Sequence, residues 1–118
     1  MHQPPDKAWL QRFCGAVVDT VTFCRYQIVM YFEDARHITF SGFFRFAPSA
    51  DISSQEWAEF PLRESSMLRV LGASIADIRT DAENQLWIDF SSGDTLVVAW
   101  TPTYECHEFT EGGERVII

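Results

Sequence analysis

The segment Leu86-Trp87-Ile88-Asp89-Phe90-Ser91-Ser92-Gly93-Asp94-Thr95-Leu96-Val97-Val98 is the part of the sequence that indicates the fold most clearly. On both sides of Ser91–Gly93, apolar residues occupy alternate positions, which is typical of strands with one buried face. The glycine supplies the backbone freedom that a tight turn between two antiparallel strands requires. The segment therefore predicts a β-hairpin.

The same pattern occurs earlier in the chain, at an offset of 57 residues before the hairpin and 58 residues within it. The first copy comprises Gly15-Ala16, Val18, Val21, Ile28, Met30, Phe32, Ile38 and Phe40. The second copy comprises Gly72-Ala73, Ile75, Ile78, Leu86, Ile88, Phe90, Leu96 and Val98. We expect an internal repeat of approximately residues 15–46 and 72–104, within a single domain that spans residues 1–118.

A short helix is expected before each copy. Asp6 is a plausible N-cap for a helix from Lys7 to about Cys14. Pro61 suits the first turn of a second helix that runs to Leu71, and a glycine follows each helix as its C-terminal stop. Residues 47–54 resemble a loop, and residues 56–60 a short edge strand. The predicted fold class is α+β, with a mainly antiparallel sheet of about seven to nine strands built from duplicated β-hairpin units and two short helices.

The outward face of the second hairpin is mixed in character. It would carry Trp87, Asp89, Thr95, Val97 and Ala99. Such a face is either partly covered or an exposed patch for binding. We favour cover by the two amphipathic helices, because their apolar sides need a surface to dock on.

Charge is the most informative bulk property of the 118 residues. The net charge is −8, and residues 51–118 contain thirteen acids and four bases, against four acids and five bases in residues 1–50. This balance disfavours nucleic acid and anionic membranes as partners and favours a basic protein. The absence of a long apolar run or a signal-peptide pattern predicts a cytoplasmic location.

Motifs for catalysis or metal binding are missing from the sequence. It has no GxGxxG, Walker, HExxH or GxSxG pattern, and its three histidines are far apart. Cys106 and His107 are adjacent, so on a strand they would point to opposite faces and could not readily share a metal. The three cysteines, Cys14, Cys24 and Cys106, are expected to be reduced. We predict no catalytic residue, no metal and no cofactor, and hence a protein that is not an enzyme.

The candidate partner-binding residues lie in an acidic stretch from Asp77 to Glu114, which has nine acids and one base. Aromatic residues among carboxylates are suited to a cationic protein surface. The candidates are Asp77, Asp81, Glu83, Trp87, Asp89, Asp94, Tyr104, Glu105, Glu108 and Glu111. The alternative is that the acids merely face solvent and the aromatics belong to the core.

The second hairpin, followed by Tyr104-Glu105, resembles a small bacterial domain family of uncharacterised function with the pattern L-x-I-x-F-x-x-G-x-x-L-x-V … Y-E. The likeness covers roughly residues 70–110, with a weaker echo in residues 15–46. The sequence departs from the pattern at Cys106-His107, where a small residue and a tryptophan are expected. In size and charge the chain is also similar to immunity proteins encoded beside polymorphic or contact-dependent toxins. That similarity implies a cytoplasmic inhibitor and supplies no catalytic residues.

Three functions follow as expectations. The first is an immunity-type protein that neutralises a basic toxin domain, such as a nuclease, through the acidic C-terminal part. The second is an enzyme or small-ligand-binding protein with a pocket on the mixed sheet face. The third is a homo-oligomeric structural or interaction module that associates through the face of Trp87.

Overall fold

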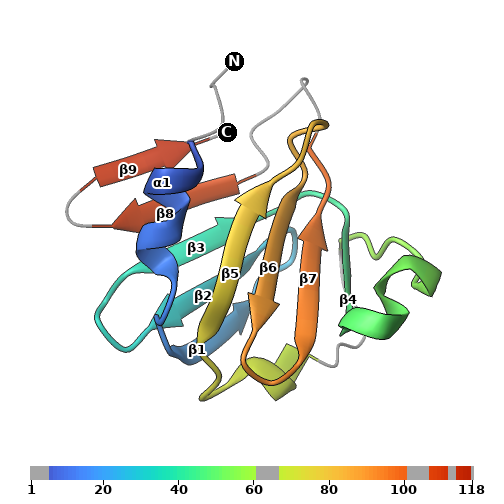
Figure 1. Cartoon of the computed structure of the whole chain (residues 1–118), viewed down its shortest axis with the longest axis horizontal. Helices are drawn as coiled ribbons and strands as arrows, with labels where there is room; N and C mark the ends of the chain where they lie inside the picture. The colour runs from blue at the N-terminus through green and yellow to red at the C-terminus, as the bar shows by residue number, and fades with distance from the viewer. Residues whose placement is uncertain (1–5, 61–66, 101–106, 112–113, 118) are drawn as a thin grey trace.

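The computed structural model describes residues 6–60, 67–100, 107–111 and 114–117. These residues form two antiparallel sheets (Figure 1). The first sheet has the order β1 (Val18–Phe23), β2 (Ile28–Phe32), β3 (His37–Phe40), β8 (His107–Glu111) and β9 (Glu114–Ile117). The second has the order β4 (Phe44–Pro48), β7 (Asp94–Val98), β6 (Leu86–Phe90) and β5 (Ile75–Thr80). The prediction of a mainly antiparallel β-protein is confirmed.

The two copies of the sequence pattern form two meanders, β1-β2-β3 and β5-β6-β7, with the same register. Val21 lies opposite Met30 in the first meander, and Ile78 lies opposite Ile88 in the second. The register shifts at equivalent places, directly after Val18 and directly after Ile75. The shared register agrees with the 57- and 58-residue offsets in the sequence.

The meanders meet through hydrogen bonds related by a local twofold. The Gly15 N–H donates to the Ile75 carbonyl at 2.8 Å, and the Gly72 N–H donates to the Val18 carbonyl at 2.8 Å. Two further bonds match in the same way, Val18 N–H to Ala73 at 2.9 Å and Ile75 N–H to Ala16 at 3.0 Å. Each half of the chain therefore offers the other the same backbone groups.

The fourth strands are exchanged between the halves. Strand β4 follows β3 in sequence but pairs with β7, so that Phe46 lies opposite Leu96. Strand β8 follows β7 but pairs with β3, so that Phe109 lies opposite Ile38. Gly42 lies between β3 and β4, where the chain crosses from one sheet to the other. A Cβ atom at Gly42 would collide with the backbone carbonyl oxygen of Ala99.

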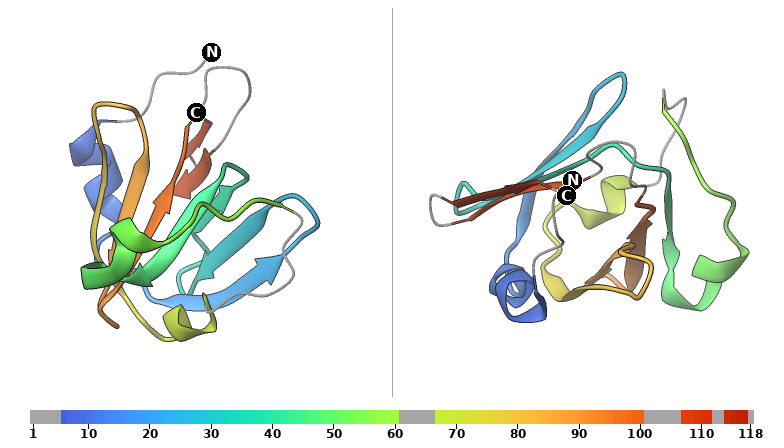
Figure 2. Two further views of the ribbon diagram at one scale, coloured as in Figure 1. Left: turned by 90° about the vertical axis from the view of Figure 1, so that its right-hand side faces the viewer. Right: turned by 90° about the horizontal axis from the view of Figure 1, so that it is seen from above.

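The two sheets pack against each other around one core (Figures 1 and 2). Leu10 and Phe13, from the segment before β1, are fully buried in it, as are Met67 and Val70 before β5. The Phe13 ring packs 6.0 Å from Phe32 and 5.9 Å from Phe109, measured between centroids. The side chains before each meander thus fill the space between the sheets.

The helical segments are shorter than predicted. The first is α1 (Lys7–Leu10) continued by the 3₁₀ helix η1 (Gln11–Phe13), and Asp6 caps it by accepting the Trp9 N–H at 2.8 Å. The second predicted helix, Pro61–Leu71, has only the 3₁₀ helix η3 (Met67–Val70) within the described residues, because residues 61–66 lie outside them. Met67 and Val70 are three positions apart, so a single 3₁₀ turn is enough to bury both side chains, and a longer helix is not needed.

Two other local predictions need correction. Residues 49–54, expected as loop, form the 3₁₀ helix η2 (Ser49–Ser54). Residues 56–60, expected as an edge strand, make only an isolated bridge between Ala58 and Phe44. No helix among the described residues is long and apolar enough to cross a membrane.

Candidate functional site

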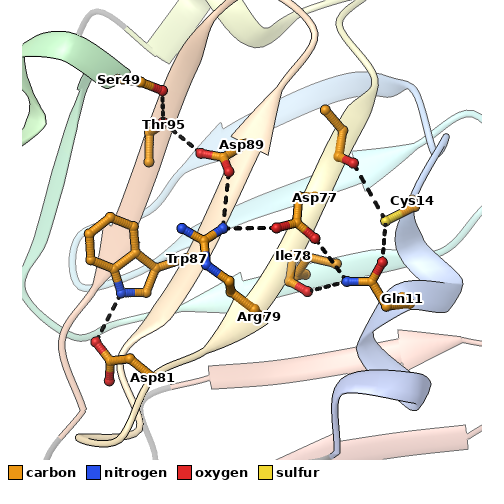
Figure 3. Close-up of polar contacts among 11 residues, drawn as sticks. Gln11, Cys14, Ser49, Asp77, Ile78, Arg79, Asp81, Trp87, Asp89 and Thr95 are labelled. Carbon is orange, nitrogen blue, oxygen red and sulfur yellow. Dashed lines mark hydrogen bonds and ion pairs between the residues drawn. The ribbon is translucent and has the colours of Figure 1, made fainter.

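The candidate site is the outer face of the second sheet, built by strand alternation. The inward residues of β6, Leu86, Ile88 and Phe90, lie in the core. Trp87 and Asp89 therefore point outward, opposite Arg79 and Asp77 on β5. Five of the ten predicted partner-binding residues lie on this sheet and in its β5–β6 turn, namely Asp77, Asp81, Glu83, Trp87 and Asp89. Figure 3 shows all of them except Glu83.

Arg79 joins the two central carboxylates. Its Nη1 lies 3.0 Å from an oxygen of Asp77 and 3.0 Å from an oxygen of Asp89. These carboxylates face each other across β5 and β6, where like charges alone would repel. The guanidinium holds them together and offsets one of the two negative charges.

The network continues to both sides of the sheet (Figure 3). On the β5 side, Gln11 Nε2 donates to the other Asp77 oxygen at 2.9 Å. On the β7 side, the Thr95 hydroxyl donates to Asp89 at 2.7 Å and lies 2.6 Å from the Ser49 hydroxyl. One chain of polar contacts therefore spans the face from η1 to η2.

The pKa of Asp77 is lowered from its ordinary value of 3.8. The largest cause is the hydrogen bond from the Gln11 side chain, and partial burial opposes it. The Ile78 N–H and Arg79 lower the pKa further. Asp77 is thus held as a carboxylate at neutral pH, which suits a charge that binds and not an acid that donates a proton.

Trp87 is held in place at its edge and on its face. Its Nε1–H donates to Asp81 at 2.9 Å, and the guanidinium carbon of Arg79 lies 5.2 Å from the ring centroid. The other Asp81 oxygen accepts the N–H groups of Glu83 and Gln85, both at 2.9 Å, which orders the β5–β6 turn. The half-buried ring is therefore a fixed anchor on this face.

A second arginine–tryptophan pair borders the face. Arg45 on β4 lies opposite Val97, and its guanidinium carbon is 4.2 Å from the centroid of the Trp57 ring. Val97 packs with Ala47 and Ile52 in a small cluster, to which Trp87 adds its ring. The β4–β7 side of the face is thus covered by η2.

The described apolar side chains of the two segments predicted as helices do not cover the mixed face. The segments expected as helices bury Leu10, Phe13, Met67 and Val70 between the sheets. Partial cover comes from Ile52 on η2, and on the β5 side from the polar side chain of Gln11. The part of the face around Asp77, Arg79 and Asp89 stays half-exposed.

Asp94 does not belong to a binding surface, and its prediction is wrong. Its side chain is 0% exposed and accepts hydrogen bonds from Arg69 Nε at 3.0 Å and from the Ser92 hydroxyl at 2.8 Å. The turn at residues 91–93 folds it inward, where it fixes the start of β7 against η3. Its role is structural.

The remaining predicted residues lie elsewhere in the chain. Glu108 is on β8 in the first sheet, opposite Thr39 and half-buried. Glu111 ends the same strand, opposite Glu114, and only its backbone is described. Tyr104 and Glu105 lie outside the described residues. The acidic stretch is therefore divided between two sheets.

Sequence reasoning missed Gln11, Arg45, Trp57 and the central role of Arg79. Arg79 had a recognisable pattern, because it lies two residues from Asp77 on a strand and so shares its face. Gln11, Arg45 and Trp57 come from other parts of the chain, and their spacing alone gives no sign of the contact.

The two described cysteines are free, and the described residues contain no metal cluster. Cys14 and Cys24 are free, as expected, and burial raises the pKa of the Cys14 thiol, which makes it less nucleophilic. Among described residues no cluster of three or more His, Cys, Asp or Glu side chains could hold a metal ion. Cys106 lies outside them, as does the side chain of His107.

Comparison of the chain with protein-family models, curated proteins and solved structures finds no match. The resemblance to immunity proteins therefore stays a prediction from the sequence.

Proposed function

We propose that the chain is a binding protein that recognises a basic protein through the outer face of its second sheet. The class that fits is a cytoplasmic immunity-type inhibitor of a basic toxin domain, such as a nuclease. The observation that carries the proposal is the network of Asp77, Arg79 and Asp89 beside the fixed ring of Trp87, whose Nε1–H donates to Asp81 (Figure 3). Arg79 contacts two carboxylates, Asp77 and Asp89, and the adjoining β5–β6 turn adds Asp81 and Glu83. One positive charge thus stands against four negative ones, so this part of the face is negative.

The side chains of this face are held in fixed positions, which favours binding. Side chains that already hold one position lose little conformational entropy when a partner docks. Asp77, Asp89 and Trp87 are each held by at least one hydrogen bond within the chain. A basic partner would meet a surface whose charges are already placed, and a nuclease must carry such positive charge to hold its own substrate.

The test first captures a basic partner by pull-down with the full chain and then compares two matched variants for binding to it. Glu83→Gln removes one charge from the exposed β5–β6 turn and keeps a side-chain oxygen that can accept the hydrogen bond that Gln85 Nε2 donates to Glu83 at 3.1 Å. Glu33→Gln makes the same change at an exposed residue of the β2–β3 turn in the first sheet. We expect Glu83→Gln to raise the Kd about fivefold, equivalent to about 1 kcal/mol, and Glu33→Gln to leave it within about twofold.

Calorimetric titration at two ionic strengths separates charge from shape. A roughly tenfold rise in salt should weaken the complex strongly, because exposed charges are screened. A Kd that does not change with salt concentration, or that changes equally in Glu83→Gln and Glu33→Gln, contradicts the proposal.

A further inference from the structure

Strand β1 presents backbone groups at the outer edge of the first sheet. Among the described residues β2 is its one strand neighbour along Thr20–Phe23. The Cys24 N–H donates to the Gln27 carbonyl at 2.8 Å and closes the β1–β2 hairpin. Because antiparallel pairing alternates, the backbone groups of Thr22 bond β2, and those of Val21 and Phe23 point away from the sheet.

The equivalent edge of the second sheet is capped. Ile78 on β5 corresponds to Val21, and its carbonyl accepts Gln11 Nε2 at 2.7 Å. Cys14 Sγ lies 3.8 Å from the carbonyl of Ala76 on the same strand. Two carbonyl groups on the edge of β5 thus accept hydrogen bonds from Gln11 on η1 and from Cys14, which follows η1.

The local twofold puts different side chains beside β1. At the 57-residue offset, Leu68 corresponds to Gln11 and Leu71 to Cys14, and η3 contacts β1. Leucine cannot donate a hydrogen bond to a strand edge. Leu68 is 66% exposed, Leu71 44% and Phe23 42%. An open strand edge bordered by large exposed apolar side chains is a surface suited to strand addition.

The charges around β1 favour a second copy of the chain as the occupant. The first half of the sequence is nearly neutral, with four acids and five bases in residues 1–50, so two copies can approach through it. Asp19 and Arg25 are exposed at opposite ends of β1. Antiparallel pairing of two β1 strands sets the Asp19 end of each against the Arg25 end of the other, which makes the edge complementary to itself.

We propose that two copies of the chain pair edge to edge through β1, about a twofold axis, and join their first sheets into one. Val21 and Phe23 supply the backbone hydrogen bonds, and Leu68 and Leu71 pack at the margin. The outer face of the second sheet takes no part, so this inference is independent of the proposed function.

The first experiment is sedimentation equilibrium of the full chain and two variants of Val21. The wild type should approach twice the monomer mass of 13.6 kDa as concentration rises. Val21→Pro removes the outward N–H without breaking a bond to β2, and should raise the dimer Kd at least tenfold (~1.4 kcal/mol). Val21→Thr keeps the N–H and the branched side chain and should still dimerise.

The second experiment moves the cap of the other half to this edge. Leu68→Gln places the counterpart of Gln11 beside β1 and should weaken dimerisation as Val21→Pro does. This variant changes only an exposed residue, so it keeps the test valid if Val21→Pro does not fold. Hydrogen exchange should show the Val21 and Phe23 amides protected in the wild-type dimer. A monomeric wild type at high concentration, or a dimer that neither variant weakens, overturns the proposal.

Discussion

At the scale of single residues, Arg79 determines how the carboxylates of the candidate site are held and how much of their charge is offset. It bonds Asp77 and Asp89, which face each other across two strands. We expect Arg79→Met to lower the free energy of unfolding by about 1 kcal/mol at neutral pH, because two facing carboxylates lose their shared partner. Urea denaturation measures this change, and Arg79→Met/Asp89→Asn should recover most of the loss because one of the repelling charges is gone.

The pH dependence of this effect has a definite sign. The pKa of Asp77 is lowered in the folded chain, mainly by Gln11 and in part by Arg79. Its stabilising contribution is therefore present above the unfolded-state pKa and is lost as pH falls through the folded-state value. The difference between wild type and Arg79→Met should shrink as pH falls below the ordinary aspartate pKa of about 3.9. A difference that stays constant while Asp77 becomes protonated would show that Arg79 acts by packing and not by charge.

Sequence reasoning succeeded at this scale where one strand sets the geometry. Alternation placed Trp87 and Asp89 on a face apart from Ile88, and the structure agrees. It failed for Asp94, which directly follows a turn and is fully buried. Gln11 could not be found, because its contact with Asp77 links residues 66 positions apart.

At the scale of secondary-structure elements, the crossing from β3 to β4 is sterically constrained at Gly42. A methyl group at Gly42 would meet the backbone carbonyl of Ala99, and a backbone group cannot turn aside as a side chain can. We expect Gly42→Ala to lower the free energy of unfolding by about 2 to 3 kcal/mol. The measurement is the midpoint of chemical denaturation.

Gly72→Ala is the matched control for this substitution. Gly72 has a φ of +79°, and a Cβ atom added there would meet no other atom within 4 Å. Alanine at this position therefore costs backbone strain without a collision, about 1 kcal/mol. Equal losses for the two variants would show that the close approach at Ala99 does not constrain the crossing.

The repeat in the sequence anticipated the elements, and the exchange of strands between them was not foreseen. The 57- and 58-residue offsets reappear in the registers of both meanders. Nothing in residues 44–48 indicates that they pair with β7, because an apolar strand fits any open edge that matches its alternation. The chain reaches β7 through the crossing at Gly42, whose close approach to Ala99 exists only in the folded protein.

At the scale of the whole molecule, the exchanged strands make each half depend on the other. The first sheet needs β8, and the second needs β4. We expect a chain cut between Ser54 and Gln55 to give two fragments that are each unfolded alone and that fold when mixed. Circular dichroism and amide NMR spectra of each fragment and of the mixture test this. A well-dispersed spectrum from either fragment alone would contradict it.

The exchange of strands also delays the pairing of β3 while the protein is being synthesised. Strand β3 has left the ribosome's decoding site by Phe40, but its partner β8 begins at His107, roughly 70 residues later. At about 5 to 20 residues per second, β3 waits roughly 3 to 13 seconds for that partner. During this interval the nascent first sheet keeps an unpaired edge at β3 and lacks the second sheet that buries its apolar face. We therefore expect the nascent chain to bind chaperones that shield unpaired strand edges.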